Sequence, residues 1–156
     1  EMSHWLAERG VRYIEQPLKE GDESNLLPLY EQSALPIYVD ESCRFAHNIP
    51  QWARAVHGIN FKLMKCGGIT EALRIIATAK AFGLKTMVGC MSESSVSIAA
   101  AAALSGVLDH IDLDSHYNLA PDPAEGAPMI KGITQPTERP GHGAQLKKET
   151  NVTTVG

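Results

Sequence analysis

Five short apolar segments recur along the chain, and their spacing constrains the fold more than any other feature. Each is rich in Val, Ile, Tyr or similar residues and ends in polar residues, which is typical of β-strands. The segments cover residues 11–15, 37–40, 59–64, 85–89 and 110–114. The polar residues at their ends lie 22 to 28 residues apart, enough for one strand, one helix and two loops. These end residues are Glu15, Asp40, Lys62, Cys90 and Asp112.

Helical signals fill the intervals between these segments. Thr70 is a suitable N-cap for a helix with apolar residues at helical spacing, which stops at Gly83. Ser94 or its neighbour can open an alanine-rich helix, and Pro28 limits the segment around it to a short helix. Strands that alternate with helices in this way indicate βαβ units and a parallel sheet.

Consecutive units of a parallel β/α barrel produce this rhythm. An open doubly wound sheet is the alternative, but it usually carries a G-x-G-x-x-G loop after its first strand, which is absent. Beyond Asp114 the sequence becomes rich in Pro and Gly, with little periodicity. We therefore predict an α/β chain with a partial barrel over 1–116, an irregular segment over 117–146 and a flexible tail over 147–156.

The composition argues against several classes of partner. With 14 Lys and Arg against 18 Asp and Glu, the formal net charge is −4, which gives no support for binding nucleic acid or an anionic membrane. No apolar run approaches the roughly 20 residues needed to cross a bilayer. The three cysteines are widely spaced and odd in number, which favours a reduced, cytoplasmic chain over a disulfide framework.

The strand ends carry residue types suited to metal-assisted proton transfer. Barrel enzymes take their catalytic groups from the carboxyl ends of several strands. Glu15 and Asp40, at the ends of neighbouring strands, offer the oxygen ligands that Mg²⁺ prefers. Lys62 could act as a general base if burial and a nearby cation lowered its pKa.

Each of these residues also has a structural interpretation. A single acid at a strand end is more often a loop cap or a surface charge than a ligand. Lys62 alternates with apolar neighbours and could simply face solvent, and Lys65 is an equally good chemical candidate. Asp112 and Asp114 would lie on one side of a strand, either as a solvated edge or as a metal motif. Their joint placement in phase with the strand ends favours a functional site.

Five motifs at the strand ends form an ordered set: Ile14–Pro17, Val39–Ser42, Lys62–Gly68, Val88–Glu93 and Ile111–Asp114. In this order they resemble the enolase superfamily, and within it the muconate-lactonizing-type subgroup and its dipeptide epimerases, typified by L-Ala-D/L-Glu epimerase. The resemblance covers residues 11–146. It implies the C-terminal part, about five βα units, of a modified TIM (β/α)7β barrel in an isomerase.

The resemblance implies a role for three of these residues in the reaction. Glu15 and Asp40 match the second and third ligands of a single Mg²⁺ ion, and Lys62 matches the acid/base lysine on one face of the substrate. Lys65 matches no catalytic position. Removal of a proton beside a carboxylate creates an unstable enediolate, which a cation held by the two acids would stabilise. Epimerisation returns the proton on the other face, so it needs two acid/base groups.

The resemblance also implies a substrate. Cys90 and Ser92 match positions that line the substrate pocket, and Asp112 and Asp114 match the pair that binds the α-ammonium group of a dipeptide. That pair favours a dipeptide epimerase that works by 1,1-proton transfer. The alternatives are an N-acylamino-acid racemase, an o-succinylbenzoate synthase or a muconate cycloisomerase-like enzyme, and, from another class, a non-catalytic fragment.

Only part of the implied apparatus is present. The first metal ligand, an Asp, and an opposing lysine in a K-x-K motif belong to earlier strands, and the residues before Glu15 offer neither. Five strands are also too few to close a barrel that needs eight. We therefore expect this chain to need the N-terminal remainder of the enzyme as its partner and to be inactive alone. The segment 117–146 would return towards a capping domain, and assembly into homo-oligomers is expected by analogy only.

Overall fold

The structure is a computed structural model that describes residues 1–148. The chain divides into two compact units: unit 1 is Glu1–Gly89 with Val107–Asp112, and unit 2 is Cys90–Gly106 with Leu113–Gly156. No helix within residues 1–148 is long and apolar enough to cross a membrane. In chain order the elements are α1 (Met2–Ala7), β1 (Ile14–Glu15), η1 (Glu23–Asn25), α2 (Leu26–Gln32), β2 (Ile37–Val39), η2 (Ala46–Asn48), α3 (Ile49–Trp52), β3 (Gly58–Phe61), α4 (Leu63–Cys66), α5 (Ile69–Ala81), β4 (Lys85–Val88), α6 (Ser95–Ala102), η3 (Ser105–Val107), β5 (His110–Ile111), η4 (Ser115–Asn118), β6 (Ala124–Glu125), β7 (Met129–Ile130), β8 (Ile133–Thr134) and β9 (Gln145–Leu146).

Unit 1 is built on a parallel sheet of five strands, as the rhythm of the sequence predicts. The strands lie side by side in chain order, from β1 to β5. Ile14 of β1 pairs with Ile37 of β2, and Ile59 of β3 pairs with Thr86 of β4. The predicted α/β architecture of consecutive parallel strands is thus confirmed. Because all the strands run the same way, their carboxyl ends meet at one edge of the sheet.

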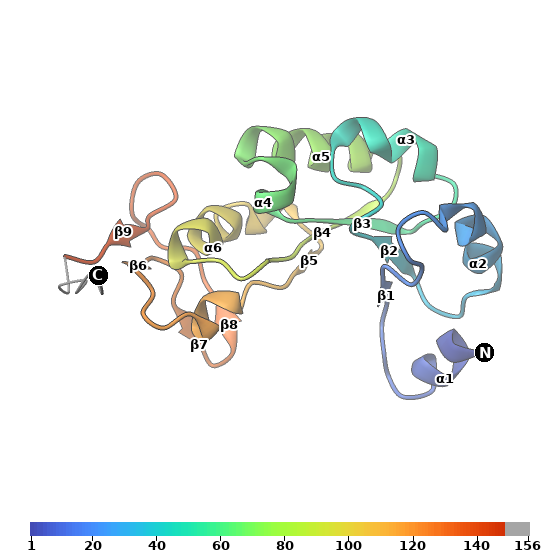
Figure 1. Cartoon of the computed structure of the whole chain (residues 1–156), viewed down its shortest axis with the longest axis horizontal. Coiled ribbons are helices and arrows are strands. Elements are labelled where there is room, and N and C mark those ends of the chain that lie inside the picture. Colours follow the sequence, from blue (N-terminus) through green and yellow to red (C-terminus); the bar gives the residue numbers. More distant parts are fainter. Residues whose placement is uncertain (149–156) are drawn as a thin grey trace, which may run out of the picture. The chain divides into compact units, whose positions relative to one another are not determined.

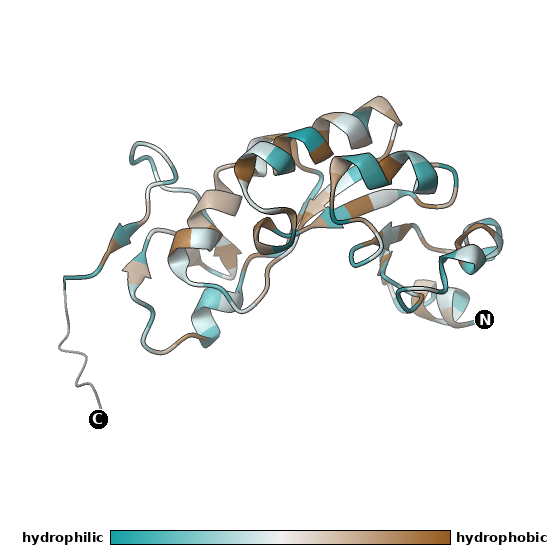
Figure 2. Cartoon of the chain, turned by 45° about the horizontal axis from the view of Figure 1, so that its top comes forward, coloured by the Kyte–Doolittle hydropathy of each residue, from teal (hydrophilic) through white to brown (hydrophobic). Residues whose placement is uncertain are grey.

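Helix α5 covers one face of this sheet (Figure 1). Its side chains Ala72, Ile75, Ile76 and Ala79 are buried, and their spacing of three or four residues places them on one helical face. This face packs against β3 and β4, and brown, apolar residues run along the strands below it in Figure 2. Burial of each isoleucine contributes about 2 kcal/mol to folding, so this contact anchors the strands whose ends carry the candidate site.

Truncation of the buried helix face should destabilise the fold. We expect Ile75→Ala to lower the free energy of unfolding by about 2–5 kcal/mol, because it leaves a cavity between α5 and the sheet. Urea unfolding followed by circular dichroism measures the change. The matched control is Leu73→Ala, because Leu73 lies on the same helix but is 49% exposed. Equal losses in the two variants would contradict the assigned packing face.

Aromatic contacts show that the sheet is strongly curled. Tyr13 directly precedes β1 and His110 lies in β5, yet their ring centroids are 4.9 Å apart. Strands at the two ends of a flat five-stranded sheet would lie roughly 19 Å apart. The Tyr38 ring, from β2, is 5.1 Å from Tyr13 and 5.5 Å from His110. A Cβ atom on Gly58 would overlap the Tyr38 ring, so the absence of a side chain at position 58 makes room for this cluster.

Three element boundaries differ from the sequence-based prediction. The third strand ends at Phe61, and the chain turns at once into α4, because Leu63 and Cys66 are buried at helical spacing. Helix α5 begins at Ile69 after Gly68, whose φ of 119° suits glycine, so Thr70 lies inside the first turn and is not the N-cap. The fifth strand ends at Ile111, ahead of both acids of the Asp-x-Asp motif.

Unit 2 contains helix α6 and two small antiparallel sheets. Ser94 is the N-cap of α6, as predicted, and Asp122 accepts hydrogen bonds from the Ser95 backbone N–H at 3.0 Å and from its hydroxyl at 2.5 Å. Strand β6 pairs with β9, and β7 pairs with β8, within the Pro/Gly-rich segment that lacks sequence periodicity. The boundaries at residues 116 and 146 stay a prediction, and the tail from residue 149 lies outside the described residues.

Candidate metal and proton-transfer site

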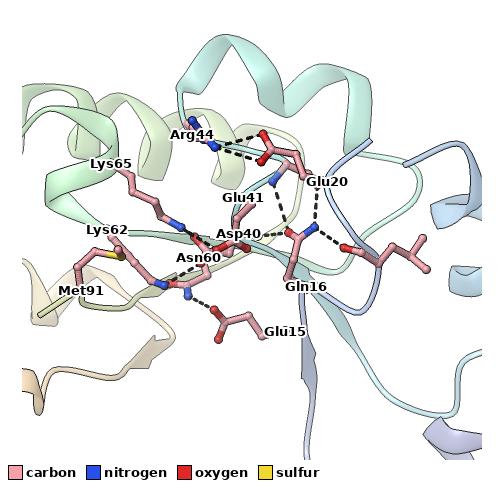
Figure 3. A network of polar contacts seen from close by, with 12 residues as sticks. Glu15, Gln16, Glu20, Asp40, Glu41, Arg44, Asn60, Lys62, Lys65 and Met91 are labelled. Carbon is pink, nitrogen blue, oxygen red and sulfur yellow. Dashed lines mark hydrogen bonds and ion pairs between the residues drawn. The ribbon is translucent and has the colours of Figure 1, made fainter. Parts of the chain in front are cut away.

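Three strand ends of unit 1 bring charged side chains together (Figure 3). Asp40 follows β2 and is 2% exposed, whereas Glu15 ends β1 and is exposed. Lys62 follows β3, and its Nζ atom lies 2.8 Å from Asp40 Oδ2. The Asn60 amide, inside β3, donates a 2.7 Å hydrogen bond to Glu15 Oε1. The structure therefore brings together the three residues at the centre of the sequence-based site.

Asp40 is held by two ammonium groups. Lys62 contacts one carboxylate oxygen, and Lys65, from the first turn of α4, contacts the other. Lys65 also lies 3.5 Å from Glu41 Oε1. Both lysine side chains are mostly buried, at 15% and 16% exposure. A carboxylate this deeply buried needs such pairing, because an unpaired charge away from water is very costly.

The electrostatics of Lys62 differ from those expected of a resting general base. Burial lowers the pKa of Lys62, but the hydrogen bond and the charge of Asp40, aided by Glu15 and Glu41, outweigh burial and raise the pKa above its ordinary value. Lys62 therefore holds its proton in this arrangement. To act as a base, its ammonium group has to leave Asp40.

Gln16 ties the first two strand ends together. Its side-chain oxygen accepts the Asp40 backbone N–H at 2.8 Å, and its nitrogen donates to the Leu18 carbonyl and the Ser42 hydroxyl, each at 2.8 Å. Gln16 has a φ of 39°, which is uncommon for a residue with a side chain. Such strain is often found beside functional groups and is stabilised by the surrounding contacts.

Sequence reasoning missed Asn60 and Gln16 and left Lys65 as an unassigned alternative. The sequence does contain a signal for Asn60. It lies two residues before Lys62, and residues two apart on a strand point to the same face, so Asn60 is expected beside the site. Gln16 directly follows Glu15, but its backbone conformation and its clamp on the next strand end leave no signal in the sequence. Lys65 is oriented by α4, whose first two residues, Leu63 and Met64, the sequence pattern assigns to the preceding strand.

The remaining predicted site residues are divided between the two units. Asp112, exposed in unit 1, follows β5, and its backbone N–H donates to the Val88 carbonyl at 2.9 Å. Burial raises the pKa of Tyr13, and the charges of Glu15 and Asp112 raise it further. In unit 2, Asp114 is exposed and lies 3.9 Å from the Cys90 sulfur.

These placements correct one expectation and leave others as predictions. Asp112 and Asp114 do not share one side of a strand, because β5 ends at Ile111 and Asp114 caps the η4 turn. Ser92 is exposed in unit 2. The predicted roles of Cys90, Ser92 and the two acids in substrate binding stay predictions.

The donor set of Glu15 and Asp40 fits a hard cation such as Mg²⁺. Both residues offer carboxylate oxygens from neighbouring strands, and oxygen ligands favour a hard cation over a softer metal. Within residues 1–148 no group of three or more His, Cys, Asp and Glu residues is arranged to hold a metal ion. The two carboxylates thus make up part of a ligand set that further oxygen atoms would have to complete.

Loss of the buried carboxylate should destabilise unit 1. We expect Asp40→Ala to lower the free energy of unfolding by about 3–5 kcal/mol, because two mostly buried ammonium groups lose their shared acceptor. Adding Lys65→Met should recover part of that loss, since one unpaired charge is then removed. Urea unfolding measures both changes, with the exposed Asp22→Ala as the control. An Asp40→Ala effect no larger than that of the control would contradict the buried pairing.

Known proteins resemble this chain in sequence and in fold. A family model described as enolase C-terminal domain-like matches residues 1–150. A curated protein named hydrophobic dipeptide epimerase, from Flavobacteria bacterium (strain MS024-2A), is 72% identical over 148 residues. That match covers 95% of this chain and 42% of the relative, so the chain spans about two-fifths of the relative's length.

Solved structures of similar fold include two dipeptide epimerases complexed with Mg and a dipeptide. The enzyme from Enterococcus faecalis V583, with L-Leu-L-Tyr, has a TM-score of 0.83 and 34% identity over 90% of this chain and 42% of its own. The enzyme from Cytophaga hutchinsonii, with D-Ala-L-Val, has a TM-score of 0.86 and 28% identity over 95% of this chain and 42% of its own.

Proposed function

The chain belongs to the enolase C-terminal domain-like family, and on that premise we propose that it supplies one side of the active site of a Mg²⁺-dependent dipeptide epimerase. The observation that carries the proposal is the convergence of Glu15, Asp40 and Lys62 at the carboxyl ends of three adjacent parallel strands. Barrel enzymes use this edge of the sheet for catalysis. The name of the flavobacterial relative and the bound dipeptides of the two solved neighbours support the substrate class.

The proposed chemistry is proton transfer at the carbon beside a carboxylate. Glu15 and Asp40 would hold Mg²⁺, which supplies positive charge close to the developing enediolate. Lys62 would move the proton on one face of that carbon. Asp112 and Asp114 would bind the α-ammonium group of the dipeptide, which orients the reacting carbon.

This chain carries one of the two acid/base groups that epimerisation requires. The other base and a further metal ligand would come from an N-terminal remainder of the enzyme, which we propose as the partner of this chain. A second acid/base group on the opposite face of the substrate is required, because a proton taken from one face has to be returned on the other. By the same reasoning we expect the chain to be inactive on its own.

A chimera tests the proposed function. The chain would replace the matching segment of the flavobacterial relative, and ¹H NMR in D₂O with Mg²⁺ would follow loss of the α-proton signal of L,L-dipeptides, hydrophobic ones first. We expect exchange at the epimerised carbon. Lys62→Met should slow epimerisation by at least about 10²-fold, whereas Lys80→Met, on the exposed face of α5, should not. If a folded chimera supplied with Mg²⁺ exchanges the α-proton of no L,L-dipeptide, the result would contradict the proposal and favour a non-catalytic role.

Asp112→Asn tests the substrate class in the same chimera. If Asp112 binds the ammonium group, the variant should raise KM for dipeptides by roughly tenfold, because a charge-assisted contact is replaced by a neutral one. Rates measured over a range of dipeptide concentrations give KM and kcat, and Asp22→Asn is the surface control. If KM and kcat for dipeptides are the same as in the parent chimera, the result would favour a substrate without a free ammonium group, such as an N-acylamino acid.

A further inference from the structure

Asn60 has one half of its side chain engaged and the other half without a partner. The residue is 1% exposed, and its Nδ2 atom donates to Glu15 Oε1 at 2.7 Å. Its Oδ1 atom is buried and has no hydrogen-bond partner among the residues that the structure describes. Buried amide oxygens are rarely left in this state, because the lost hydrogen bond to water is not replaced.

The Asn60 amide and the end of the Lys62 side chain both lie next to Gly89. A Cβ atom built on Gly89 would lie 3.0 Å from Asn60 Nδ2, 3.2 Å from Asn60 Oδ1 and 3.1 Å from Lys62 Cε, so the amide and the lysine side chain border the same small volume. Figure 3 shows Lys62 and Asn60 in the same region, with the Lys62 ammonium group on Asp40 and the Asn60 nitrogen on Glu15. Because Gly89 has no side chain, the volume that both groups border is not filled by a side chain at position 89.

Lys62 needs a second acceptor if the proposed function holds. Its ammonium group is bonded to Asp40 Oδ2 at 2.8 Å. When Asp40 turns that oxygen to a cation, the cation and the ammonium group compete for the same carboxylate. The ammonium group then has to move, and the nearby buried acceptor with an open position is the Asn60 amide oxygen.

We propose that Asn60 is a positioning residue for Lys62: its Oδ1 atom accepts the Lys62 ammonium group that Asp40 releases, while its Nδ2 atom holds Glu15. The inference rests on the proposed function and adds a residue to it. An amide is suited to this place because it offers a donor to one neighbour and an acceptor to the other. A carboxylate at position 60 would repel Glu15, and an apolar side chain would offer neither contact.

The structural test is a crystal structure of the chimera with Mg²⁺ bound. We expect Lys62 Nζ within about 2.7–3.2 Å of Asn60 Oδ1, the normal range for such a hydrogen bond. A structure in which Lys62 remains on Asp40, or turns away from Asn60, would overturn the proposal. This readout does not depend on turnover.

The kinetic test compares the two epimers of one dipeptide. Each acid/base group removes the proton of one epimer, so in D₂O the exchange of each epimer reports one group, and Lys62→Met identifies the epimer served by Lys62. In Asn60→Leu, we expect exchange from that epimer to fall at least tenfold more than exchange from the other. Both rates come from one sample, so loss of folded protein or of metal cancels in their ratio.

Two further variants complete the design. Asn60→Asp keeps an acceptor beside Lys62 but loses the donor to Glu15. Compared with Asn60→Leu, it should bring the ratio of the two exchange rates back towards that of the parent, even if both rates are lowered. Gln51→Leu, an exposed amide on α3, is the control and should leave both rates unchanged. Equal slowing of both epimers in Asn60→Leu would overturn the role of Asn60 while the proposed function stands. A parent chimera that exchanges neither epimer would instead overturn the proposed function.

Discussion

The buried carboxylate of Asp40 is the constraint on which the candidate site depends. A charge that is 2% exposed can be kept only with compensating partners, and two lysines and the Gln16 clamp on its backbone supply them. Lys62 and Lys65 reach the two oxygens from positions three residues apart, which an extended strand would not allow. Because β3 ends at Phe61 and α4 begins at Leu63, both lysines can reach Asp40 and compensate its charge.

The sequence predicted the framework of the site better than its internal contacts. Strand ends follow from apolar runs and their spacing, so the sequence alone predicts Glu15, Asp40 and Lys62 at one edge of a parallel sheet. Hydrogen bonds between side chains carry no such periodic signal. The amide of Asn60, the positive φ of Gln16 and the helical turn that aims Lys65 all depend on tertiary contacts.

The acids of the Asp-x-Asp motif show a second limit of predicting side-chain orientation from a sequence pattern. An alternating pattern places both side chains on one face only while the backbone stays extended. Here the strand ends at Ile111, and the η4 turn takes over at Asp114. Asp112 therefore lies just beyond the strand, whereas Asp114 is the N-cap residue of η4.

The contact between Tyr38 and Gly58 has a consequence for how related sequences can vary. The aromatic ring occupies the volume that a side chain at position 58 would need, so the two positions share one space in the concave side of the sheet. A larger residue at 58 is compatible with the same curvature only if 38 becomes smaller. We therefore expect these two positions, 20 residues apart on neighbouring strands, to covary in homologues as a size-compensating pair.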